Sequence, residues 1–73
     1  MTAPKKRSVL IAGHSTSLSL EPEFWQALKT LADRDGLSVT KLLTEIDAGR
    51  GDRNLSSAAR VYILNRIQAG SPI

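Results

Sequence analysis

The stretch STSLSLEPEFW, residues 15–25, contains a change of hydrophobic period that decides the fold. In its first half serine alternates with leucine, so Leu18 and Leu20 fall on one face of a strand and the serines on the other. At Pro22 the period lengthens to that of a helix, because proline suits the first helical position. The sequence therefore predicts a half-buried strand over about residues 14–21 that leads directly into a helix.

Three helices are expected after this strand, and their ends follow from capping residues. Gly36 is a typical C-terminal cap of the first helix, and Ser38 and Asn54 are good N-caps for the second and third. The predicted helices span residues 22–35, 38–48 and 54–68. Since the third is apolar over most of its circumference, it must be buried, within its own domain or against a partner.

The size and composition of the chain limit how it can be stabilised. With 73 residues it buries only a small core, and without cysteine it has no disulfides. A single histidine makes a structural zinc site untenable, so we expect no metal and no cofactor. Because one strand cannot form a sheet alone, we expect it to pair with the same strand of a second copy in a two-fold homodimer.

The charge is concentrated at the N-terminus. The basic run at residues 5–7 accounts for the whole net charge of +3, and the remaining basic and acidic residues balance. We interpret residues 1–6 as a disordered basic arm and residues 7–73 as a single domain. Such an arm often contacts nucleic acid, although it can also serve as a solubilising tail. Residues 7–12 are expected to be extended, with both faces covered or packed on a second chain.

An enzyme or a membrane protein is not expected. Gly13, His14 and Ser15 look like the start of a serine-hydrolase elbow, but the glycine required two positions later is Ser17. The chain has no other histidine, and adjacent residues on a strand point to opposite faces. We therefore expect no catalytic residue. No apolar run is long enough for a membrane span or a signal sequence, which favours a cytoplasmic protein without membrane contact.

From LSLE through PEFWQALKTLADRDG to LSVTKLLTEI, residues 18–46, the sequence resembles the ribbon-helix-helix family of bacterial DNA-binding dimers. The family's glycine-x-hydroxyl turn corresponds to Gly36-Leu37-Ser38, and a wider similarity to small bacterial members covers about residues 7–68. The resemblance implies a mainly α chain with one β-strand, forming an intertwined homodimer with a two-stranded antiparallel ribbon. The third, C-terminal helix is additional to the family's core motif.

The resemblance also implies a function and a set of contacts. The ribbon would dock in the major groove of double-stranded DNA, which is wide enough to admit it. The expected base contacts are Ser15, Ser17 and Ser19. The start of the second helix would bind phosphate through its backbone N–H groups. The expected phosphate contacts are Lys5, Lys6, Arg7, Ser38, Val39, Thr40 and Lys41. Serine is short, so base recognition would be sequence-specific or only weakly specific.

Two functions remain open on the sequence. The first is a DNA-binding transcriptional regulator. The alternative is a protein-interaction or antitoxin-like adaptor dimer that binds a protein partner through the third segment, Leu55–Gln68. The alternative loses its main support if the dimer itself buries Tyr62, Ile63 and Leu64.

Overall fold

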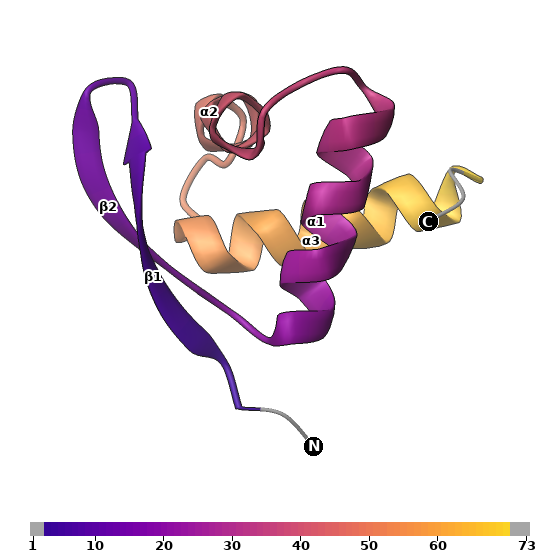
Figure 1. The fold of residues 1–73 in the computed structure, drawn as a ribbon, viewed down its shortest axis with the longest axis horizontal. Coiled ribbons are helices and arrows are strands. Elements are labelled where there is room, and N and C mark those ends of the chain that lie inside the picture. The colour runs from indigo at the N-terminus through magenta and orange to yellow at the C-terminus, as the bar shows by residue number, and fades with distance from the viewer. Residues whose placement is uncertain (1–2, 71–73) are drawn as a thin grey trace.

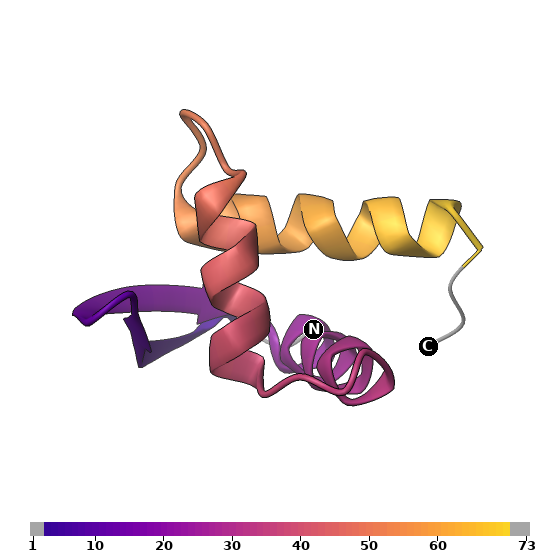
Figure 2. The same ribbon diagram turned by 90° about the horizontal axis from the view of Figure 1, so that it is seen from above.

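The computed structural model describes residues 3–70, which form a β-hairpin followed by three helices (Figure 1). The elements are β1 (Lys5–Ile11), β2 (His14–Leu20), α1 (Pro22–Arg34), α2 (Val39–Ala48) and α3 (Leu55–Gln68). The hairpin lies on one side of the helices, and its turn projects away from α1 and from the end of α3 (Figure 2). Among residues 3–70, no helix has the length and apolar character needed to cross a membrane.

The expectation of one β-strand, completed only by a second copy, is wrong. β1 and β2 pair antiparallel within the same chain, in a register that runs from Lys5 opposite Leu20 to Ile11 opposite His14. A two-residue turn, Ala12-Gly13, joins the two strands. Ala12 has a φ of 51° and Gly13 a φ of 81°. Positive φ at both central residues is the mark of the type I′ turn, whose twist matches that of a hairpin.

The basic run is part of this hairpin. Lys5 and Lys6 lie in β1, so they do not belong to the disordered arm that the sequence predicted for residues 1–6. Residues 1 and 2 of that predicted arm lie outside the described part of the chain. Lysine is depleted in strands, but it suits an edge strand because its charge discourages pairing with a further strand.

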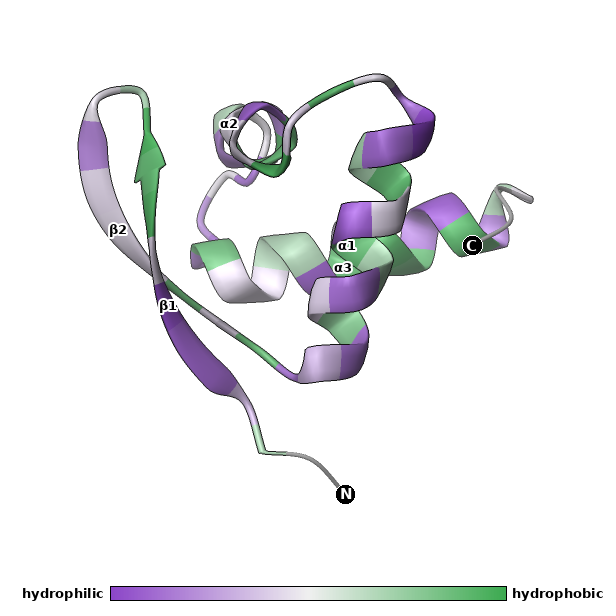
Figure 3. Ribbon diagram, viewed as in Figure 1, coloured by the Kyte–Doolittle hydropathy of each residue, from purple (hydrophilic) through white to green (hydrophobic). Residues whose placement is uncertain are grey.

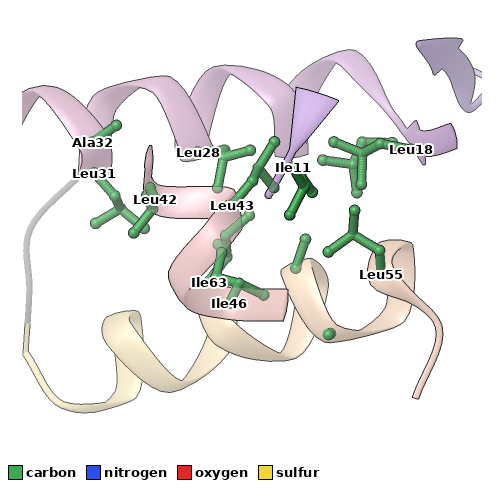
Figure 4. Close-up of a cluster of buried hydrophobic side chains, with 13 residues drawn as sticks. Ile11, Leu18, Leu28, Leu31, Ala32, Leu42, Leu43, Ile46, Leu55 and Ile63 are labelled. Carbon is green, nitrogen blue, oxygen red and sulfur yellow. The ribbon is translucent and has the colours of Figure 1, made fainter. Parts of the chain in front are cut away.

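One face of the hairpin supplies part of the core. Directly opposed residues in an antiparallel pair share a face, and Ile11, Leu18 and Leu20 are buried on the face that meets the helices. Figure 4 shows Ile11 and Leu18 within the buried cluster. The helices add the rest of the buried cluster: Leu28, Leu31, Ala32, Leu42, Leu43, Ile46, Leu55, Ala58, Ala59 and Ile63. No polar or charged residue among the described ones is classed as buried. The described chain therefore closes a hydrophobic core without a second copy.

The first two turns of α3 hold the edge of β2 that faces away from β1. The backbone N–H of Ser19 donates to the Oγ of Ser56 at 2.8 Å, and Nη2 of Arg60 donates to the Ser19 carbonyl at 3.1 Å. Nε and Nη2 of Arg60 also donate to Oε1 of Glu21, at 3.1 and 3.0 Å. α3 is thus fastened to the point where β2 passes into α1.

α3 is buried on one side only. Ile63 packs in the core at 1% exposure, whereas Leu64 and Ile67 are each 50% exposed. Near the end of the helix, Nη1 of Arg66 donates to Oδ2 of Asp35 at 2.8 Å, which fixes α3 to the end of α1. The sequence predicted that this segment is buried either within its own domain or against a partner. The structure shows that one side of the helix is buried within its own chain.

Candidate nucleic-acid interface

The face of the hairpin turned away from the helices is polar. We call it the outer ribbon face. The register places opposite each other Lys6 and Ser19, Ser8 and Ser17, and Leu10 and Ser15. All of these residues are exposed except Ser19, which is half-buried. The three serines that the sequence predicted to share a face therefore do share one, and β1 adds a fourth hydroxyl, a lysine and a leucine.

Lys6, Ser8 and Leu10 were not predicted to lie beside the serines. They alternate along β1 with a period of two, as the serines do along β2. Recognising the turn at residues 12–13 would therefore have predicted that these three side chains lie on the same face as the serines. Leu10, 59% exposed, gives the turn end of the face an apolar group, and Lys6 gives the other end a positive charge. Figure 3 shows this polarity along β1, which changes from hydrophilic to hydrophobic towards the turn.

The chemistry and the width of the outer ribbon face are compatible with the major groove of DNA. A hydroxyl can donate or accept a hydrogen bond, so it can meet the edge of any base. Paired strands lie about 4.8 Å apart and the major groove is about 12 Å wide, so the groove is wide enough to admit a two-stranded ribbon. A short side chain that both donates and accepts distinguishes bases poorly, which indicates weak sequence discrimination.

The start of α2 offers free backbone donors. Ser38 caps the helix, since its Oγ accepts from the backbone N–H of Lys41 at 3.0 Å and its carbonyl accepts from Leu42 at 3.0 Å. The N–H groups of Val39 and Thr40 have no hydrogen-bond acceptor within residues 3–70. Unpaired N–H groups and the helix dipole together favour an anion at this position.

The two sets of predicted DNA contacts lie on differently directed surfaces of one chain. Figure 1 looks nearly along the axis of α2, so the start of this helix lies on the line of sight. The outer ribbon face is instead the side of the hairpin opposite the buried Leu18 and Leu20. Of the residues at the helix start, Ser38, Thr40 and Lys41 are exposed and Val39 is half-buried. The family resemblance predicted that these residues and the ribbon serines both contact DNA. No local pattern in the sequence specifies where the two sets lie relative to each other.

Lys5 and Arg7 lie on the opposite face of the ribbon from the serines. The register places Lys5 opposite Leu20 and Arg7 opposite Leu18, which is the face that meets the helices. Lys5 is exposed, and Arg7 is half-buried with its guanidinium over the ring of Trp25. The basic run therefore divides between the two faces, with only Lys6 beside the serines.

Three other arginines are occupied by acidic partners. Arg50 pairs with Asp47, Arg60 with Glu21 and Arg66 with Asp35, at N–O distances of 2.7, 3.0 and 2.8 Å.

Two of these pairs, those made by Arg60 and Arg66, lower the pKa of the carboxyl group that they contact. A hydrogen bond from its own backbone N–H and one from Arg60 lower the pKa of Glu21. The hydrogen bond from Arg66 lowers the pKa of Asp35, and the same contact raises the pKa of Arg66. These groups hold the fold together and stay charged at neutral pH. Within residues 3–70, no cluster of histidine, cysteine, aspartate or glutamate could hold a metal ion.

Comparison with known proteins identifies similar domains. A family model described as "Ribbon-helix-helix domain" matches residues 4–67. The solved structure of an uncharacterized protein from Bordetella pertussis Tohama I is 36% identical to this chain, with a TM-score of 0.75. The match covers 93% of this chain and 58% of that one. No curated protein matches the sequence.

Proposed function

The chain belongs to the ribbon-helix-helix family of DNA-binding regulators, and on that basis we propose that it binds double-stranded DNA and regulates transcription. The observation that carries the proposal is the outer ribbon face. It presents hydroxyls and one lysine on a two-stranded ribbon, while the opposite face is anchored in the core. A reading surface on a rigid element is what groove recognition requires.

Within this proposal, the hairpin enters the major groove with Ser15, Ser17 and Ser19 towards the base edges. Ser17 lies in the middle, opposite Ser8, and is exposed. Ser19 is half-buried and its backbone is held by α3, so its hydroxyl has the least freedom of the three. We therefore assign the largest share of base contact to Ser17.

The proposed phosphate contacts fall into two groups. Lys5, Lys6 and Arg7 come from β1, and the start of α2 contributes Ser38, Val39, Thr40 and Lys41. A helix start with free N–H groups binds phosphate without sequence preference, so it would set the position of the domain on DNA. Each phosphate contact should lower log K by about 0.9 for every tenfold rise in salt.

The homodimer also remains a proposal, in a changed role. The hairpin is complete within one chain, so a second copy is not needed to form the ribbon. Family members typically bind DNA as dimers, so a second copy would add a second ribbon to the complex. A regulator of this kind would act in the cytoplasm of a bacterial cell.

An amide NMR titration with a short mixed-sequence duplex at low salt tests the proposal. We expect shifts at Lys6, Ser15 and Ser17. The variant Ser17→Glu should weaken binding at least about tenfold, which corresponds to about 1.4 kcal/mol. Gln68→Glu, an equal charge change at an exposed position near the end of α3, should weaken it less than about twofold, since a distant charge is screened.

Equal losses in the two variants would show that only net charge matters and would remove the serine face from the interface. Shifts confined to residues outside the hairpin would do the same.

A second candidate function is an adaptor that binds a protein through α3. Its support is the exposed pair Leu64 and Ile67, each 50% exposed. Against it, Ile63 is buried within the chain and Tyr62 is half-buried, so only part of the apolar surface of the helix is available. Absence of any duplex-induced shift in the ribbon would favour this function over DNA binding.

A further inference from the structure

Arg7 and Trp25 form a contact at the edge of the core, against which the Trp25 ring packs. The guanidinium carbon of Arg7 lies 4.4 Å from the centre of the Trp25 ring, well within the range of a cation–π interaction. The Nε of Arg7 is buried and has no hydrogen-bond partner within the described residues. The terminal nitrogens are not among the buried unpaired atoms, so the outer end of the guanidinium reaches solvent.

Arg7 differs from the other arginines that contact an aromatic ring. Arg60 lies 5.8 Å from the centre of the Phe24 ring, and its charge is met by Glu21.

Arg66 lies 5.7 Å from the Tyr62 ring, and its charge is met by Asp35. Arg7 makes no ion pair within residues 3–70, although its ring contact is the shortest of the three. It is therefore a fixed, half-buried cation that no acidic side chain of the described residues neutralises.

We propose that Trp25 holds Arg7 in place as a receptor for a DNA backbone phosphate beside the ribbon. This proposal rests on the proposed function. The planar guanidinium can donate two parallel hydrogen bonds to a phosphate, and stacking on an indole leaves its outer N–H groups free to do so. Because the side chain is already ordered, binding avoids an entropy cost of about 0.5–1.5 kcal/mol for immobilising it. Lys5, exposed on the same face, adds a second positive charge.

In this arrangement Arg7 contacts the phosphate and Trp25 is a positioning residue. Arg7→Gln should raise the Kd for the duplex about tenfold and reduce the salt slope by about 0.9, the value of one phosphate contact. The matched control is Gln68→Glu, which makes the same change in net charge at an exposed position near the end of α3 and should change Kd by less than about twofold. Equal effects of the two variants on Kd and slope would overturn the assignment to Arg7.

Double variants separate positioning from a structural role of the indole. Trp25→Leu should weaken binding in the wild-type background and have no further effect in the Arg7→Gln background. Trp25→Phe keeps an aromatic face and should recover most of the affinity. An equal loss from Trp25→Leu in both backgrounds would show that the indole acts independently of Arg7 and would refute the positioning role.

Fluorescence gives a readout that does not require Trp25 to be replaced. Trp25 is the only tryptophan of the chain, so its emission reports directly on the arginine stacked over it. Duplex binding should change this emission in the wild type. The change should be lost in Arg7→Gln, while the amide shift of Ser17 still shows that the duplex is bound. An unchanged emission response in Arg7→Gln would overturn the proposal even if Trp25→Leu fails to fold.

Inorganic phosphate at constant ionic strength distinguishes a free anion from the DNA backbone. We expect it to leave the emission unchanged at concentrations where the duplex saturates. If phosphate alone reproduces the change, the site is a general anion site and the DNA assignment is wrong. If the wild type shows no ribbon shifts with duplex, the proposed function and this inference both fail. Ribbon shifts with an Arg7→Gln variant that behaves like Gln68→Glu refute the inference alone.

Discussion

Replacing Ile63 by alanine tests whether α3 belongs to the core of a single chain. Ile67 provides a matched control, because it is the same residue type one turn further along the same helix. Ile63 is 1% exposed and Ile67 is 50% exposed. We expect Ile63→Ala to lower the free energy of unfolding by about 2–5 kcal/mol and Ile67→Ala by less than about 1 kcal/mol.

The size of the effect follows from burial. Isoleucine loses three carbon atoms on replacement by alanine, and at about 0.8 kcal/mol for each buried methylene the transfer term alone is about 2.4 kcal/mol. The cavity left among the core leucines adds to this cost. A chain of this length has a total stability of about 4–11 kcal/mol, at about 0.05–0.15 kcal/mol per residue. Ile63→Val, expected to cost about 0.5–1.5 kcal/mol, keeps the test measurable if the alanine variant unfolds.

Urea unfolding, followed by circular dichroism at two protein concentrations about tenfold apart, provides the measurement. An interlocked homodimer would lose about 1.4 kcal/mol of apparent stability on tenfold dilution, whereas a core closed within one chain loses none. Equal costs at positions 63 and 67 would show that Ile67 is buried in an assembly. That result, or a midpoint that falls on dilution, would refute the single-chain core.

Two further predictions concern the hairpin turn and the ion pairs. Ala12 has a φ of 51°, a left-handed conformation that asparagine tolerates better than alanine. Ala12→Asn should therefore raise the free energy of unfolding by about 0.5–1 kcal/mol, measured by thermal unfolding. A destabilised variant would contradict the turn geometry. Since the pKa values of Glu21 and Asp35 are lowered on folding, their contribution is present above the ordinary values of 4.5 and 3.8 and is lost as the pH falls through the lowered values. The urea midpoint should therefore fall in acid, less so in Glu21→Gln, and the same pH profile in both proteins would exclude a role for Glu21.

Local patterns predicted much of this structure. The alternation of serine and leucine placed Leu18 and Leu20 on one face, and both are buried. Ser38 and Asn54 were expected to cap helices, and each accepts a hydrogen bond from the backbone three residues ahead. The family inferred from residues 18–46 is confirmed by the match over residues 4–67. These signals depend on neighbours within one or two turns, so a single sequence contains them.

The pairing of β1 with β2 was missed for a physical reason. Ala12-Gly13 is a weak hairpin signal, because alanine rarely adopts positive φ and the usual pairs begin with asparagine, aspartate or glycine. β1 also lacks clean alternation, since its inward residues include Lys5 and Arg7 at one end and Ile11 at the other. Which inward residues of β1 are buried depends on which part of the hairpin the helices cover, and no local pattern in the sequence gives this.

The contacts that tie α3 to β2 were likewise beyond local reasoning. Ser19 and Ser56 are 37 residues apart, and Arg60 reaches Glu21 across 39 residues. Both residues of α3 are polar and half-buried in a segment that the sequence marked as apolar. The position of Arg7 over Trp25 is similar, because a basic residue in a charged run carries no signal of a ring beneath it.

The edges of β2 explain why a second copy is not required for the ribbon. A strand has two edges that can pair, and β1 takes one of them along all seven residues of β2. At Ser19, the Oγ of Ser56 and the guanidinium of Arg60 take the backbone N–H and C=O of the other edge. A dimer built by pairing two β2 strands would have to displace β1, or else α3 at this point. The segments that flank the family's core motif, β1 before it and α3 after it, therefore supply within one chain the strand pairing and core packing that the sequence assigned to a partner.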